Sequence, residues 1–86
     1  MMNMDTVTIR FFAAAEEAAG EAETTRPYRE GVTLTELLEE LVRAKPELSG
    51  VLRTCSYLRN SVAARDLGRP LAPGDVVDIL PPFSGG

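Results

Sequence analysis

The sequence contains no histidine and a single cysteine, Cys55, and these two absences exclude several kinds of chemistry. One cysteine cannot form a disulfide within the chain. The absence of histidine and of a second cysteine argues against a zinc site, and we expect no metal. A Ser-His or Cys-His nucleophile pair is impossible. Because Cys55 follows Leu48, Val51 and Leu52 at apolar spacing, we interpret it as a small core residue.

Long apolar runs and clusters of positive charge are also missing. No apolar run approaches the length of a membrane span, and residues 1–5 lack the basic and apolar regions of a signal peptide. The net charge is −4 and the nine basic residues are spread singly, which argues against nucleic-acid and membrane binding. We therefore expect a cytoplasmic protein. The acidic excess favours solubility over a basic partner surface.

The chain has 86 residues, of which 44% are hydrophobic, as is typical of one small globular domain. Alternating apolar residues predict a strand over 6–12. An Ala/Glu stretch predicts a short helix over 13–19, which Gly20 ends. A second strand is predicted over 21–29, and Pro27 within it indicates an exposed edge.

The clearest helix signal follows Thr33. This residue is a candidate N-cap, and Glu36 three positions later completes a capping box. Pro46 ends the helix. The apolar residues repeat at helical spacing and form one stripe that we assign to the core: Leu34, Leu37, Leu38, Leu41 and Val42.

The remaining segments predict a short helix over 46–55, a strand over 56–62, an irregular stretch over 63–74 and a strand over 76–80. One long helix packed across a small mixed sheet, an α+β fold, is the simplest arrangement of these elements. The first and last strands are the most apolar, so we expect them side by side in the middle of the sheet.

The sequence ends in Gly85-Gly86, preceded by the stiffening pair Pro81-Pro82. Two residues without side chains allow a backbone to enter a slot too narrow for any Cβ. We therefore expect a domain over 1–80 and a functional extended tail over 81–86. The alternative is an inert, disordered end. A carboxylate must be activated before it reacts, and the chain has no phosphate-cradling glycine loop. We expect it to be non-catalytic alone and activated by a separate enzyme.

Three blocks of the sequence resemble the molybdopterin synthase small subunit, the sulfur carrier of molybdenum cofactor biosynthesis. They are the ending LPPFSGG over 80–86, FFAAAEEAAG over 11–20 and PLAPGDVV over 70–77. The resemblance implies a ubiquitin-like β-grasp fold, in which one main helix packs on a small mixed sheet and a C-terminal tail protrudes.

The resemblance also implies a mechanism. Gly86 would be adenylated by a ubiquitin-activating-type adenylyltransferase, which uses ATP, and converted to a thiocarboxylate. The chain itself would bind no cofactor. The tail, narrow at Gly85, would then enter the large synthase subunit in a complex of two small and two large subunits. There the sulfur would pass to cyclic pyranopterin monophosphate and form molybdopterin.

The same resemblance assigns partner-binding residues, which are Leu80, Pro81, Pro82, Phe83, Ser84 and Phe12. For Phe83 we favour the interface, whereas for Phe12 and Leu80 core packing is an equal alternative. Rival functions are a related sulfur carrier for thiazole, cysteine or tRNA thiolation, a ubiquitin-like protein modifier, and a plain interaction domain.

Overall fold

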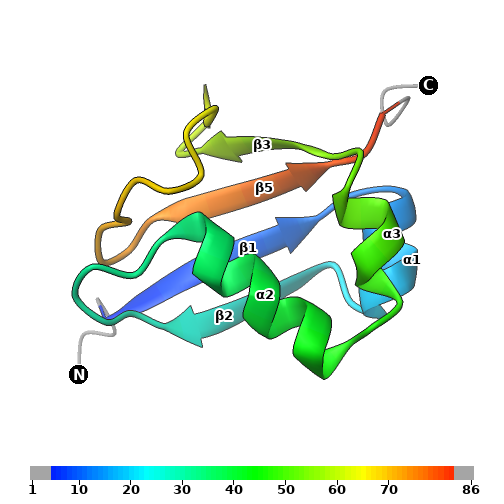
Figure 1. The fold of residues 1–86 in the computed structure, drawn as a ribbon, viewed down its shortest axis with the longest axis horizontal. Helices are drawn as coiled ribbons and strands as arrows, with labels where there is room; N and C mark the ends of the chain where they lie inside the picture. Colours follow the sequence, from blue (N-terminus) through cyan, green and yellow to red (C-terminus); the bar gives the residue numbers. More distant parts are fainter. Residues whose placement is uncertain (1–4, 83–86) are drawn as a thin grey trace.

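The structure is a computed structural model that describes residues 5–82. The elements are β1 (Thr6–Phe11), α1 (Ala14–Ala19), β2 (Glu23–Pro27), α2 (Leu34–Ala44), α3 (Leu48–Leu52), β3 (Ser56–Arg59), β4 (Val62–Ala63) and β5 (Val76–Leu80). The strands β1 and β5 lie side by side and parallel at the centre of a five-stranded mixed sheet of order β2-β1-β5-β3-β4 (Figure 1). The other strand pairs are antiparallel. The central pairing predicted for the first and last strands is confirmed.

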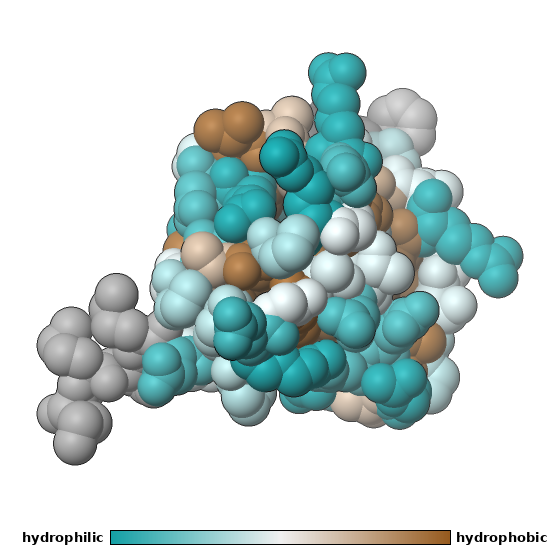
Figure 2. All heavy atoms as spheres, turned by 60° about the vertical axis from the view of Figure 1, so that its left-hand side comes forward, coloured by the Kyte–Doolittle hydropathy of each residue, from teal (hydrophilic) through white to brown (hydrophobic). Residues whose placement is uncertain are grey.

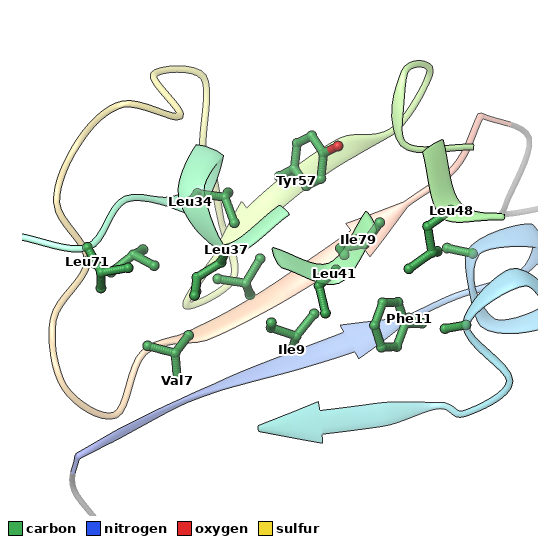
Figure 3. Packing of buried hydrophobic residues seen from close by; sticks show 14 residues of the cluster. Val7, Ile9, Phe11, Leu34, Leu37, Leu41, Leu48, Tyr57, Leu71 and Ile79 are labelled. Atoms are coloured by element: carbon green, nitrogen blue, oxygen red, sulfur yellow. The ribbon is translucent and has the colours of Figure 1, made fainter. Parts of the chain in front are cut away.

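One face of the two central strands forms the core together with α2, which crosses in front of the sheet in Figure 1. The inward residues of β1 and β5 are at most 2% exposed, and each contributes about 1.5–3 kcal/mol by burial. These residues are Val7, Ile9, Phe11, Val77 and Ile79. Figure 3 shows several of them packed against Leu34, Leu37 and Leu41 of α2. The predicted apolar stripe is therefore the core face, although Leu38 and Val42 at its margin are only partly buried.

The capping box of α2 is present. The Glu36 N–H donates to Thr33 Oγ1 at 3.2 Å, and the Thr33 N–H donates to Glu36 Oε1 at 2.9 Å. These bonds satisfy two backbone donors that the first turn leaves without helical partners, and such a cap is worth about 1 kcal/mol. The helix ends at Ala44, two residues before Pro46, as predicted.

The short helix α1 ends at Gly20, whose φ of 76° places it in the left-handed region. The Gly20 N–H donates to the Glu16 carbonyl at 2.9 Å, and Lys45 Nζ donates to the Ala19 carbonyl at 2.7 Å. The first bond closes the end of α1, and the second fixes it to the end of α2. The predicted edge position of β2, which ends in Pro27, is also confirmed.

The strand predicted over 56–62 is wrong in one respect, because the chain reverses within it. Asn60 and Ser61 have φ values of 50° and 71°, and they connect β3 to β4 as a two-residue hairpin turn. Positive φ at both central residues is the requirement of a type I′ turn. Cys55, just before β3, is half-buried against the core, and burial raises the pKa of its thiol.

Candidate partner-docking site

The residues that alternate with the core positions of the central strands point to the opposite side of the sheet. We call this side the outer face and define it by six residues from β1, β5 and β3: Thr8, Arg10, Val76, Asp78, Leu80 and Leu58. All of these except Asp78 are at least partly exposed. The outer face is therefore the side of the central strands that remains available to another protein.

An ion pair occupies the middle of the outer face. Arg10 and Asp78 are register partners on β1 and β5. The Arg10 guanidinium donates to the Asp78 carboxylate twice, from Nε at 2.7 Å and from Nη2 at 3.0 Å. This bidentate contact raises the pKa of Arg10, through the hydrogen bond and the charge of Asp78. The opposite charges of the two side chains cancel, and the Arg10 side chain, at 44% exposure, is more accessible than that of Asp78, at 9%.

Phe12 and Leu80 lie at the end of the outer face where both central strands finish. The last paired positions are Phe11 and Ile79, so the parallel register carries Phe12 next to Leu80. Phe12 is 37% exposed and Leu80 is half-buried. Core packing, the alternative for these two residues, is therefore excluded for Phe12. An aromatic and an aliphatic side chain at one exposed edge favour contact with a partner.

The backbone around Phe12 is held by the start of α1. The Phe12 carbonyl accepts the N–H groups of Ala15 at 3.0 Å and Glu16 at 3.4 Å. Ala13, which directly follows Phe12, has a φ of 51°, a conformation that costs a non-glycine residue about 1–3 kcal/mol. The helix thus fixes the Phe12 backbone at the exposed end of the sheet.

The structure places only part of the predicted tail. Pro81 is buried and Pro82 is exposed, directly after the central strand β5. Since β5 pairs with β1 on one side and β3 on the other, the root of the tail is anchored at the middle of the sheet. Phe83, Ser84, Gly85 and Gly86 lie outside the described residues, so their predicted roles stay predictions.

A second polar cluster, which was not predicted from the sequence, lies at the opposite end of the sheet. The buried Asp75 carboxylate accepts from Arg59 Nε at 2.7 Å, Asn60 Nδ2 at 2.9 Å and the Ala72 N–H at 2.8 Å. Burial alone would raise the pKa of Asp75, but these three donors outweigh it and the pKa lies below its ordinary value. The cluster fixes the β3–β4 hairpin to the start of β5.

The side-chain pairs of both polar clusters join residues at least 15 positions apart in the sequence. Arg10 and Asp78 could have been recognised as outward positions of two strands expected to pair, but only the register makes them partners.

Within residues 5–82, no helix is long and apolar enough to cross a membrane. In the same part of the chain, no group of three or more His, Cys, Asp or Glu residues could hold a metal ion.

Comparison with known proteins places this arrangement in a family. The model of the ThiS family matches residues 9–86. A molybdopterin synthase sulfur carrier subunit from Chlamydomonas reinhardtii is 35% identical over 81 residues, which cover 93% of this chain and 98% of the relative.

Two solved structures show the same fold. The crystal structure of a small archaeal modifier protein from Haloferax volcanii superposes with a TM-score of 0.80 and 32% identity, covering 94% of this chain and 99% of the other. Subunits 1 and 2 of the molybdopterin-converting factor from Helicobacter pylori were solved as a complex, from which one chain superposes with a TM-score of 0.69 and 30% identity over 94% of this chain and 99% of that chain. The mixed sheet with its packed helix is thus the ubiquitin-like β-grasp, and the chain belongs to the ThiS family, together with molybdopterin synthase sulfur carrier subunits.

Proposed function

We propose that this protein is the small, sulfur-carrying subunit of a molybdopterin synthase. The observation that carries the proposal is the 35% identity to a molybdopterin synthase sulfur carrier subunit across 98% of that relative's length. The structure supports it with a partly exposed outer face that ends at Phe12 and Leu80, next to the root of the tail. The six residues after Leu80 span at most about 20 Å when extended, enough to reach into a partner.

The chemistry of the proposal takes place at the Gly86 carboxylate. The activating enzyme transfers AMP from ATP to this carboxylate and releases pyrophosphate. Hydrosulfide, or a donor that delivers sulfur at the same oxidation level, then attacks the acyl carbon, AMP leaves, and a thiocarboxylate remains. In the synthase, the thiocarboxylate sulfur forms a bond to a carbon of cyclic pyranopterin monophosphate and replaces an oxygen substituent, whose C–O bond breaks. Water then cleaves the acyl–sulfur bond, which leaves the sulfur on the substrate and restores the carboxylate.

In these steps, this chain binds the partner and positions the reacting carboxylate, and it takes no part in acid–base catalysis. A tail that ends in Gly85-Gly86 fits a narrow channel because neither residue carries a Cβ. The outer face packs first against the adenylyltransferase and then against the large subunit, with Phe12, Leu80 and Phe83 as apolar anchors. Pro81, Pro82 and Ser84 guide the extended tail. The functional complex contains two small and two large subunits.

The experiment combines the chain with a candidate activating enzyme, ATP and a sulfur donor, followed by intact mass analysis. We expect a mass increase that corresponds to the exchange of one oxygen for sulfur at the C-terminus. With the large subunit and substrate, the charged chain should form molybdopterin. Deletion of Gly86 should abolish both steps while the thermal unfolding transition stays unchanged. Molybdopterin formation by the deletion variant would refute the tail mechanism.

A second candidate is a protein modifier joined to lysine side chains of other proteins. The similarity to the small archaeal modifier protein favours it, because that structure superposes on this chain with a TM-score of 0.80 at 32% identity. Activation is the same in both cases, and the outcomes differ only in the group that attacks the adenylate. Recovery of the chain on lysines of other proteins, with no oxygen-to-sulfur exchange, would select the modifier. Transfer of sulfur to a thiazole, cysteine or tRNA pathway in place of molybdopterin would select a related carrier.

A further inference from the structure

A cavity of about 370 Å³, open to solvent on one side, is lined by residues of the β3–β4 hairpin, the loop over 64–71 and the start of α2. Figure 1 shows these segments near the start of β5, away from the end where β5 leads into the tail. Leu34, Leu71 and Val62 give it apolar walls. Figure 2, which turns this side of the molecule forward, shows brown apolar residues among teal hydrophilic ones. The volume suits one or two apolar side chains.

Arginines surround this apolar cavity. The lining includes Arg59, Arg65 and Arg69, against one acidic residue, Asp66. Arg59 is already paired with Asp75. Within residues 5–82, neither Arg65 nor Arg69 forms an ion pair, and both are exposed. A positive rim on a chain of net charge −4 is complementary to an acidic ligand.

The cavity borders an unpaired strand edge. β4 is the last strand in the sheet order, and its other neighbour position is vacant among the described residues. The Ala64 N–H donates inward to the Tyr57 carbonyl at 2.9 Å, so alternation turns the Ala63 N–H and carbonyl outward. Val62 is 68% exposed beside this edge. Exposed backbone groups of this kind accept a further strand from a partner.

We propose that the cavity and the β4 edge bind an extended acidic peptide segment of a partner protein. An apolar side chain of the segment enters the cavity between Leu34 and Leu71. Its acidic side chains pair with Arg65 and Arg69, and its backbone adds to the outer edge of β4. An inorganic anion uses only the arginines, whereas a peptide strand uses the apolar walls and the edge as well. This surface goes beyond the proposed function, because the tail leaves from the opposite end of the sheet.

The test is an NMR titration of the full chain with a synthetic hexapeptide of alternating aspartate and leucine and with blocked ends. We expect amide shifts concentrated in residues 62–71 and slower hydrogen exchange at Ala63. The Arg65→Glu/Arg69→Glu variant should bind roughly tenfold or more weakly, since each exposed charge pair is worth a few-fold in affinity. The matched control is Arg43→Glu/Arg53→Glu, which makes the same charge change on α2 and beside α3 and should bind as the parent does.

Three results would overturn the proposal. They are equal weakening by both double variants, equal binding of a peptide with lysine in place of aspartate, and complete displacement of the peptide by inorganic phosphate at matched ionic strength. Val62→Asp is a second variant that should weaken binding without touching the arginines. Repeating the titration with the Gly86 deletion separates the two proposals, because peptide binding should persist when sulfur transfer is lost.

Discussion

The central strands β1 and β5 carry two different rows of side chains, one on each face of the sheet. Toward the helices they present residues that are at most 2% exposed, such as Ile9 and Ile79. Toward the outer face they present Thr8, Arg10 and Leu80, which are all partly exposed. One period-two pattern thus provides both a core face and a partly exposed face from the same two strands.

The two faces of the central strands differ in the position and pairing of their charged side chains. The core row is apolar except at its end, where Asp75 continues the line of Val77 and Ile79 and is held by three donors. The outer row places Arg10 and Asp78 in its centre as a neutralised pair. Because the Asp78 side chain is only 9% exposed, the two hydrogen bonds from Arg10 compensate for the cost of removing this carboxylate from water.

The largest expected effect comes from the core row. Phe11→Ala should destabilise the fold by about 3–5 kcal/mol, because the ring is almost fully buried and leaves a cavity. Urea unfolding measures this loss. Thr8→Ala, on the outer face of the same strand, is the control and should cost less than about 1 kcal/mol. A loss of that small size for Phe11→Ala would contradict the assignment of the core face.

The second-largest loss of stability is expected at Asp75, the charged end of the core row. Asp75→Ala should cost about 3 kcal/mol, because it leaves the Arg59 guanidinium and two other donors without their acceptor. The pKa of Asp75 is lowered on folding, so its ionised form stabilises the native state fully above the ordinary value of 3.8. This stability is lost as the pH falls below that value.

Unfolding free energies of the parent and of Asp75→Asn, measured from about pH 7 to about pH 2, check this sign. The difference between the two proteins should be constant at neutral pH and should shrink in acid. A difference that grew in acid would mean that the carboxyl group is protonated in the native state.

The outer face should respond in binding rather than in stability. Phe12→Ala should change the unfolding free energy by less than about 1 kcal/mol, because its side chain is 37% exposed. We expect its affinity for the large subunit to fall tenfold or more, since exposed aromatic residues are frequent interface anchors. Calorimetric titration with the large subunit measures the affinity. Unchanged affinity would place the interface elsewhere.

The smallest change in folding stability is expected at the turn between β3 and β4, away from both faces of the central strands. Ser61 has a φ of 71°, which glycine adopts at no steric cost. Ser61→Gly should therefore stabilise the fold by up to about 1 kcal/mol, because Asn-Gly is the preferred type I′ pair. The thermal midpoint should rise slightly while partner binding stays the same. A lower midpoint would contradict the turn type.

The tail and its neighbours show how far local signals extend. The prolines at 81 and 82 and the two final glycines were visible in the sequence, and the family resemblance built on them is confirmed. The exposure of Phe12 was not predictable, because its alternating position after β1 is equally compatible with burial and with an interface. The structure decided this by ending β1 at Phe11 and beginning α1 at Ala14.

The sequence by itself determined the elements that depend on neighbours a few residues apart. Strand alternation in β1, the capping box at Thr33 and Glu36, and the stop at Gly20 each act within about one turn or one strand. Tertiary structure alone decided the Arg10–Asp78 pair, which spans 68 positions, and the arginine-lined cavity built from α2, β3, β4 and a loop. The physical reason is that strand register and long-range contacts follow from packing the whole core at once, and no local window contains that information.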